Sequence, residues 1–286
     1  MRGVIPMKSD LTHATFIIPI RIESDDRLRN VITTLCYLIT KFDTNIIIHE
    51  HSETSVFEEV ALPQIAEYCS TIPHSDDLSC IKHTFIKTSD PTFHRQKVLN
   101  DMLMESTTSV VINYDCDILL PYESYKEAYN LIMNCDADVV YPYQEGNTQL
   151  QVHADDSIVS EFLNDYCNFK ILAKSSTLYD AKYGFCQFFN RDAYIEGGME
   201  NENFKAYAPE DVERYYRFTN LGYNVKRCGN VVYHLEHART PNSWFSNPHM
   251  EENNKEWQKV QAMSKDELYT YITSQPYYIE RTNGQK

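Results

Sequence analysis

The chain has 286 residues, 42% of them hydrophobic, which is enough to bury a sizeable core. It carries 41 acidic against 26 basic residues, and the net charge of -15 disfavours nucleic acid as a partner. No apolar run approaches the roughly 18 residues of a membrane span, and no signal-peptide core precedes the first strand. Eight cysteines without a CxxC pair favour free thiols. Together these features predict a soluble, cytoplasmic protein with no membrane span.

The first part of the chain alternates between short apolar runs and segments with helical periodicity. The predicted elements are a strand at 15–20, a helix at 25–41, a strand at 45–50, a helix at 56–68, an irregular stretch with two prolines, a helix at 95–104 and a buried strand at 109–114. Such alternation predicts a parallel sheet with helices packed on it.

The alternation continues through the second part of the chain. The predicted elements are a helix at 122–133, strands at 137–141 and 185–190, a helix at 209–220, one or two strands in 224–235 and a helical tail at 251–272. Residues 144–179 lose the periodicity, which is typical of insertion loops and helices around a pocket. The sequence therefore predicts one α/β domain over 1–286, with a central, mostly parallel mixed sheet flanked by helices.

Two aspartates, Asp115 and Asp117, follow the buried strand at 109–114 directly. Ligands of open α/β sheets collect at the carboxyl ends of the strands, so this position favours a functional role. Residues i and i+2 of an extended chain point to the same side, and both carboxylates can share a divalent cation or divide between a metal and a ribose hydroxyl. A solvated turn is the other interpretation of the same pattern.

Three further segments, taken with the aspartates, resemble the β-1,4-galactosyltransferases and related inverting family-2-like and family-7-like GT-A glycosyltransferases. They are Ile18-Pro19-Ile20-Arg21, the run from Phe93 to Asn100, and a glycine-containing stretch from Tyr183-Gly184 to Tyr207-Ala208-Pro209-Glu210-Asp211. The resemblance implies a GT-A fold with a nucleotide-sugar-binding half at about 15–120, an acceptor and metal half at about 121–245 and a helical tail at 250–286. The implied activity is metal-dependent, inverting transfer of a hexose or N-acetylhexosamine from a UDP-sugar to a saccharide or glycoconjugate hydroxyl.

The chain also departs from the family pattern. Glu23 stands where the pattern has a second arginine, which removes one positive contact to the donor. Tyr207 replaces a tryptophan, and Ala208-Pro209 replace two glycines. These changes predict a different acceptor and a stiffer loop.

The resemblance also implies a metal site. Asp117 binds the ion directly, Asp115 belongs to the metal site by holding a metal-bound water or else holds the ribose, and a downstream histidine completes the set. His234 follows an apolar strand directly and is the preferred ligand, with His237 as the alternative. Carboxylate and imidazole together suit Mn²⁺, with Mg²⁺ as the other candidate cofactor.

The remaining site residues follow from the same motifs. Asp211 is the predicted catalytic base, and Glu210 is expected to bind another acceptor hydroxyl. Glu50, at the end of the second strand, either meets the uridine or belongs to a structural turn. The predicted donor contacts are Arg21 and Arg95 at the diphosphate and Pro19 and Phe93 at the base.

Two other functions are compatible with the same sequence. A nucleotidyltransferase can share a parallel α/β core and metal-bound carboxylates, but no glycine-rich phosphate loop follows the first strand. A non-catalytic sugar-binding or scaffold protein on a transferase fold is the second alternative. The simultaneous presence of Asp115, Asp117, Asp211 and His234 argues against it.

Overall fold

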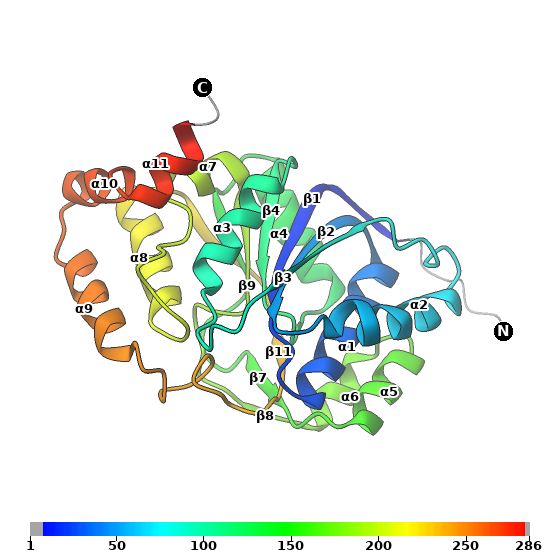
Figure 1. Cartoon of the computed structure of the whole chain (residues 1–286). Helices are drawn as coiled ribbons and strands as arrows, with labels where there is room; N and C mark the ends of the chain where they lie inside the picture. The colour runs from blue at the N-terminus through cyan, green and yellow to red at the C-terminus, as the bar shows by residue number, and fades with distance from the viewer. Residues whose placement is uncertain (1–7, 284–286) are drawn as a thin grey trace.

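The computed structural model of the chain describes residues 8–283 and is built around a seven-stranded sheet (Figure 1). Its order is β10-β6-β9-β4-β1-β2-β3. The bounds are β1 (Ser9–Ile20), β2 (Phe42–Ser52), β3 (Ile81–Lys87), β4 (Val110–Tyr114), β6 (Val139–Tyr143), β9 (Cys186–Asn190) and β10 (Val225–Asn230). Neighbouring strands pair in parallel, apart from β9, which runs antiparallel to β4 and β6. The predicted mostly parallel mixed sheet is confirmed.

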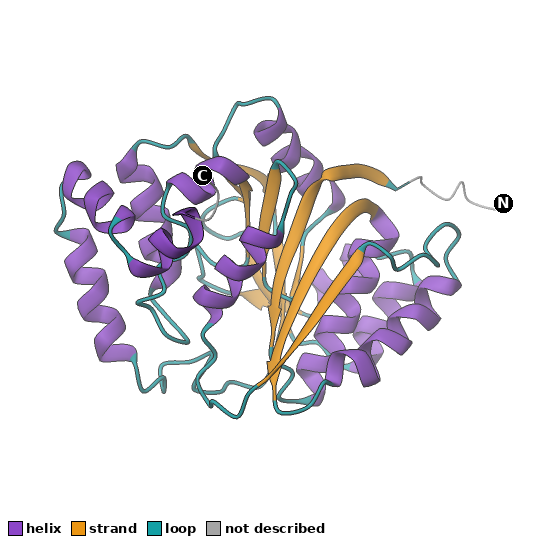
Figure 2. Cartoon of the chain, turned by 45° about the horizontal axis from the view of Figure 1, so that its top comes forward, coloured by secondary structure: helices purple, strands orange, loops and turns teal. Residues whose placement is uncertain are grey.

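Helices flank this sheet on both sides (Figure 2). α1 and α2 pack together at one end, and α8 to α11 lie together at the other (Figure 1). None of these described helices has both the length and the apolar content that crossing a bilayer requires. The bounds are α1 (Asp25–Lys41), η1 (Phe57–Ala61), α2 (Leu62–Ser70), α3 (Arg95–Glu105), α4 (Tyr122–Met133), α5 (Asp156–Asn164), α6 (Phe169–Lys174), α7 (Arg191–Glu196), α8 (Glu210–Leu221), α9 (Met250–Gln261), α10 (Lys265–Thr273) and α11 (Pro276–Asn283).

A second, four-stranded sheet lies at the carboxyl edge of the first. Its order is β5-β11-β7-β8, with β5 (Ile118–Leu119), β7 (Gln149–Val152), β8 (Ser176–Leu178) and β11 (Val232–Leu235). β11 pairs antiparallel with β5, which follows the two aspartates, and parallel with β7. The segment 144–179 therefore contains strands as well as the loops and helices that its sequence predicts.

The sequence misses β3, which lies in the stretch expected to be irregular. β3 is the edge strand of the large sheet, and none of its residues is fully buried. Polar residues such as Lys82 and Thr84 interrupt its apolar pattern, because an edge strand needs no continuous hydrophobic run. The helix expected at 56–68 is present, but its first turn is the π-helical η1.

Glu50 belongs to a structural turn at the end of β2. Its buried carboxylate accepts hydrogen bonds from the backbone N–H of Val56 at 2.8 Å and of Phe57 at 3.1 Å. The hydroxyl of Ser55 donates a third bond at 2.7 Å. These bonds satisfy the free N–H groups where η1 begins, so the carboxylate is engaged in the fold.

α8 reaches the sheet through a contact that only glycine allows. A Cβ on Gly197 would lie 2.4 Å from Cε1 of Phe218, well inside van der Waals contact. Phe218 is buried and packs on Phe189 of β9 and on Tyr194 of α7. The absence of a side chain at Gly197 thus sets how closely α8 approaches the sheet.

We expect Gly197→Ala to lower the free energy of unfolding by about 1–3 kcal/mol, because the new methyl group overpacks the contact with Phe218. Urea unfolding measures this change. In the double variant Gly197→Ala/Phe218→Leu, the smaller side chain relieves the clash, so the combined loss is less than the sum of the two single losses. A Gly197→Ala variant as stable as the wild type contradicts this account.

Candidate active site

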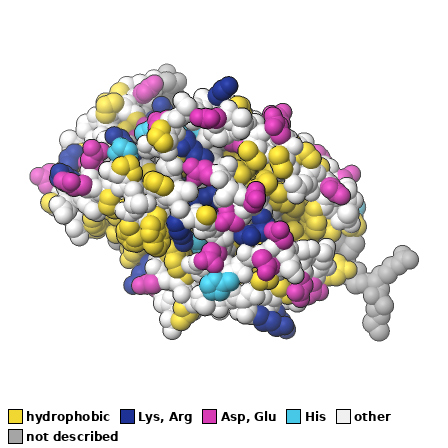
Figure 3. Space-filling model, turned by 60° about the horizontal axis from the view of Figure 1, so that its bottom comes forward, with side chains coloured by type: hydrophobic (Ala, Val, Ile, Leu, Met, Phe, Trp, Pro, Cys, Tyr) yellow, Lys and Arg dark blue, Asp and Glu magenta, His cyan; other side chains and the backbone are white. Residues whose placement is uncertain are grey.

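A cavity opens at the carboxyl ends of β1 and β4, on the face that comes forward in Figure 3. Acidic and basic side chains mingle across the middle of that face. The structure brings every site residue predicted from the sequence to this cavity; these are Pro19, Arg21, Phe93, Arg95, Asp115, Asp117, Glu210, Asp211 and His234. Segments far apart in the sequence therefore converge on one place, while the role of each residue stays a prediction.

Strand pairing places two histidines beside Asp117. Asp117 immediately precedes β5, and the antiparallel register sets His234 of β11 opposite Ile118. The backbone N–H of Leu235 donates to the carbonyl of Asp117 at 2.8 Å, which fixes this register. His237 follows as β11 ends and turns back to the same carboxylate. The second sheet thus assembles this group.

Asp117, His234 and His237 can hold a metal ion. One ligand atom from each lies within 4.8 Å of the other two, and all three residues are buried. The Nε2 atoms of His234 and His237 lie 3.8 Å and 3.2 Å from Oδ2 of Asp117. Nδ1 of His237 lies 2.8 Å from the carbonyl oxygen of Ala238 and can donate to it, which leaves Nε2 as a ligand. The sequence treats the histidines as alternatives, whereas the structure brings both to the aspartate.

The protonation states of this group suit a cation. Burial lowers the pKa of His234 to about 4, so the imidazole is neutral at physiological pH. Burial also acts to raise the pKa of Asp117, but His234 and His237 outweigh it and hold this pKa below its ordinary value. A carboxylate beside two imidazoles is the donor set that a divalent transition metal takes.

Asp115 points to a different partner. Its Oδ1 accepts a hydrogen bond from Nη2 of Arg95 at 2.5 Å, and it is not part of the three-residue group. Burial raises the pKa of Asp115, and the Arg95 charge opposes that rise. The structure therefore shows Asp115 paired with an arginine, and its part in metal or ribose binding stays a prediction.

Arg21, predicted to contact the diphosphate, forms several hydrogen bonds within the protein. Arg21 donates from Nε to the carbonyl of His51 at 2.8 Å and from Nη1 to those of Asp90 and Pro91 at 3.0 Å each. These three bonds tie Arg21 to the end of β2 and to the loop before α3. Arg21 thus lines the cavity with a guanidinium whose N–H donors are largely engaged by backbone carbonyls.

Arg27 and Arg239 also line the cavity, and neither was predicted as a site residue. Neither forms an ion pair with a carboxylate within residues 8–283; Arg27 donates to the hydroxyl of Ser243 at 3.0 Å, and Arg239 lies 5.2 Å from the ring centre of Trp244. In the sequence, Arg27 lies shortly after the Ile18–Arg21 motif and Arg239 lies two residues after His237. These positions are only weak signals that either arginine belongs to the site. Their charges are available to an anion.

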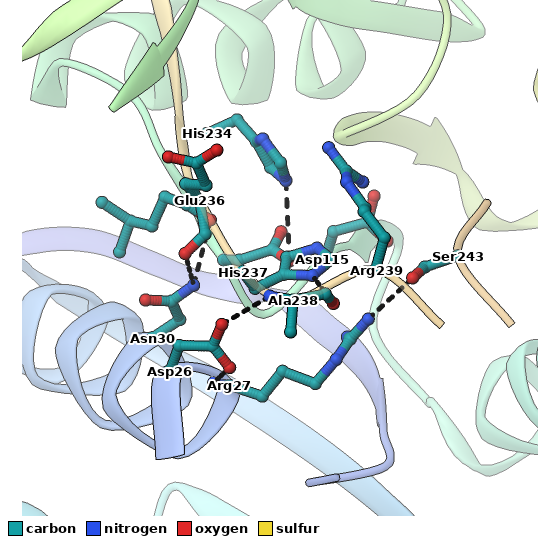
Figure 4. A network of polar contacts seen from close by, with 12 residues as sticks. Asp26, Arg27, Asn30, Asp115, His234, Glu236, His237, Ala238, Arg239 and Ser243 are labelled. Carbon is teal, nitrogen blue, oxygen red and sulfur yellow. Dashed lines mark hydrogen bonds and ion pairs between the residues drawn. The ribbon is translucent and has the colours of Figure 1, made fainter. Parts of the chain in front are cut away.

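Contacts from α1 hold the loop that follows β11 (Figure 4). Asp26 accepts a hydrogen bond from the backbone N–H of Ala238. Nδ2 of Asn30 donates to the carbonyls of Leu235 and Glu236 at 3.0 Å and 3.2 Å. These bonds hold the residues on both sides of His237 in the sequence. They therefore fix the position of His237 next to Asp117 and His234.

Glu210 and Asp211 lie in the first turn of α8, where the helix dipole favours acidic residues. Asp211 forms an ion pair with Arg214 one turn further along. A Cβ on Gly184 would lie 2.8 Å from Oδ2 of Asp211, so the glycine in the Tyr183-Gly184 motif gives this carboxylate its room.

Glu210 differs from Asp211 in its surroundings. It is 8% exposed, and its Oε2 has no hydrogen-bond partner among the described residues. Burial raises the pKa of Glu210 to about 8, and the charge of neighbouring Asp211 adds to the effect. At neutral pH Glu210 therefore holds a proton while Asp211 pairs with an arginine.

A second cavity meets the first at these two acidic residues. It lies between the loop 179–184 and the segment 207–212, in which α8 begins. Both cavities are lined by Tyr179, Gly184, Tyr207, Glu210 and Asp211. The carboxylate of Asp211 thus stands between the metal group's cavity and a separate approach from solvent.

The chain matches no protein-family model and no curated protein by sequence. Its structure is similar to that of S. aureus TarS 1-349 in complex with UDP-GlcNAc, with a TM-score of 0.55 and 13% identity over 97% of this chain and 75% of the TarS chain. It is also similar to the mannosyltransferase PcManGT from Pyrobaculum calidifontis in complex with GDP-Man and Mn²⁺, with a TM-score of 0.48 and 13% identity over 99% of this chain and 77% of that one. The TarS likeness confirms the predicted fold, that of the GT-A nucleotide-sugar transferases.

Proposed function

We propose that the chain is one GT-A domain that acts as a metal-dependent, inverting glycosyltransferase. It transfers a hexose or N-acetylhexosamine from a UDP-sugar to a hydroxyl of a saccharide or glycoconjugate. The observation that carries this proposal is the meeting of two groups in one cavity, the metal-binding set of Asp117, His234 and His237 and the acidic pair Glu210 and Asp211. The metal-binding set suits a nucleoside diphosphate, and the acidic pair suits an acceptor hydroxyl.

The donor half of the proposal rests on charge. A divalent cation held by Asp117, His234 and His237, with Mn²⁺ the best match to these ligands, stabilises the negative charge that develops on a leaving diphosphate. Arg27 and Arg239 add positive charge to the same cavity, and within residues 8–283 neither of them pairs with a carboxylate. TarS, which has the same fold, binds UDP-GlcNAc, and this supports a UDP-sugar as donor.

The acceptor half rests on the unequal states of the two acidic residues. The charged Asp211 takes the proton of the acceptor hydroxyl as its oxygen forms a bond to the anomeric carbon. The bond from that carbon to the phosphate oxygen breaks on the opposite face, and UDP leaves with the electron pair. Glu210, which holds its proton, donates a hydrogen bond to a sugar hydroxyl. The cavity between the loop 179–184 and the segment 207–212 is the proposed path of the acceptor.

The first experiment tests the donor site by calorimetric titration of UDP into the protein. We expect binding with Mn²⁺, and we expect it to be lost with a chelator or in Asp117→Asn, because the metal group is then incomplete. Asp43→Asn is the matched control, since Asp43 is exposed on β2 and away from the cavity. Equal UDP binding with and without metal argues against this donor site.

Asp211→Asn separates catalysis from donor binding. We expect UDP with Mn²⁺ to bind as in the wild type while the rate of transfer falls by about 10²–10⁴-fold, the usual contribution of a general base. The assay measures UDP release from UDP-galactose, UDP-N-acetylgalactosamine and UDP-N-acetylglucosamine. An unchanged rate rules out Asp211 as the base, and a retained anomeric configuration in the product rules out inversion. A wild type that binds UDP but transfers no sugar favours the non-catalytic alternative.

Glu210 gives a prediction for stability against pH. Its pKa of about 8 in the folded chain exceeds the ordinary glutamate value of 4.5, so its stabilising contribution is complete below about pH 4.5 and is lost as pH rises through 8. We expect Glu210→Gln, which cannot ionise, to gain stability over the wild type between pH 6 and 8, by at most about 1.4 kcal/mol per pH unit. Urea unfolding without metal measures the difference, and parallel curves for the two proteins would disprove the raised pKa.

A further inference from the structure

Arg214 stands between the acidic pair and the protein interior. Its Nη2 donates to Oδ1 of Asp211, and its Nη1 donates to Oε2 of Glu200 at 2.8 Å. Arg214 and Glu200 are each 1% exposed, and neither lines the two cavities. One guanidinium thus joins a buried carboxylate to the carboxylate at the cavity.

Glu200 is itself held from several sides. The hydroxyl of Tyr194 donates to Oε1 at 2.5 Å, and Nδ2 of Asn113 lies 3.4 Å from the same oxygen. Asn100 on α3 bonds both the backbone N–H and the backbone carbonyl of Glu200, at 2.8 Å and 3.0 Å. Because these partners come from α7, β4 and α3, Glu200 is a fixed anchor for Arg214.

A second arginine pair on α8 shows what is special about the first. Arg217 and Glu213 are also 1% exposed or less, and they form two hydrogen bonds at 2.7 Å and 3.2 Å. That pair is closed on itself and on backbone carbonyls, without contact with the cavity. Arg214 differs because it also bonds Asp211 at the cavity. Buried ion pairs contribute little net stability compared with apolar side chains, so stability does not explain why Arg214 joins two carboxylates.

We propose that Arg214 is a positioning residue for Asp211, with Glu200 as its anchor; this rests on the proposed function. Arg214 occupies Oδ1 of Asp211 and so turns Oδ2 toward Gly184 and the cavity, where it takes the acceptor proton. The same guanidinium places a positive charge beside Asp211. Arg214 does not touch the donor, so its effect falls on the rate of transfer and not on donor binding.

The test removes both charges of the anchoring pair in Arg214→Met/Glu200→Gln, so that no unpaired charge is left buried. Arg217→Met/Glu213→Gln is the matched control on the same helix. We measure kcat and KM as UDP release from the most active of the three UDP-sugars, with water as acceptor and Mn²⁺ present, together with UDP affinity and thermal midpoints. We expect kcat to fall on the order of 100-fold in the first variant, the cost of a misplaced catalytic group, with donor KM and UDP affinity unchanged. The control loses stability alone.

Arg214→Lys provides the rescue, because it keeps a cation beside Asp211, and we expect it to recover part of the lost kcat. A kcat that falls no further than in the control, or a rise in donor KM alone, overturns the positioning role. Asp211→Asn distinguishes the two levels of the proposal. If Asp211→Asn is inactive while the Arg214 variant is fully active, only the positioning role fails. If Asp211→Asn is fully active, the proposed function fails as well.

Discussion

The site depends on the surroundings of four of the five carboxylates that line its cavity, in a protein whose net charge is already -15. These are Asp115, Asp117, Glu210 and Asp211. Like charges this close raise one another's pKa unless each is compensated. Arg95 of α3 and the buried Arg214 of α8 pair with Asp115 and Asp211, and Glu210 keeps a proton. Asp117 instead faces the imidazoles of His234 and His237, so its charge remains available to a cation.

This division of charge explains why the polar network extends so far beneath the cavity. Arg95 bonds both Asp115 and Asn113, and Asn113 in turn lies against Glu200. From Glu200 the network continues through Arg214 to the acidic residues of α8. Asp115 and Asp211 are therefore joined beneath the cavity by contiguous polar contacts, as a low-dielectric interior requires of buried charges. Local repositioning of one carboxylate alters the surroundings of the next.

Much of the fold could be predicted because its periodic elements are strongly patterned. The helices at 25–41 and 122–133 have the bounds that their sequence indicates, and the aspartates follow β4 as expected. The weakly patterned edge strand β3 could not be found in this way. Neither could the partnership of Arg214 with Glu200, because helical spacing reveals only neighbours along α8, whereas Glu200 precedes that helix. Long-range pairing of this kind depends on the packing of α8 on the sheet.

The arginines show most clearly why residue type alone does not define an anion site. A guanidinium has five N–H donors, and in Arg21 backbone carbonyls occupy several of them. The positive charges that no carboxylate of the described chain pairs with come instead from Arg27 on α1 and Arg239 after β11. The first turns of α1 also bond the loop after β11, through Asp26 and Asn30. The contacts that hold the loop after β11 therefore also bring Arg239 to the cavity beside Arg27, and in the proposed function both charges would act together with the metal on the diphosphate.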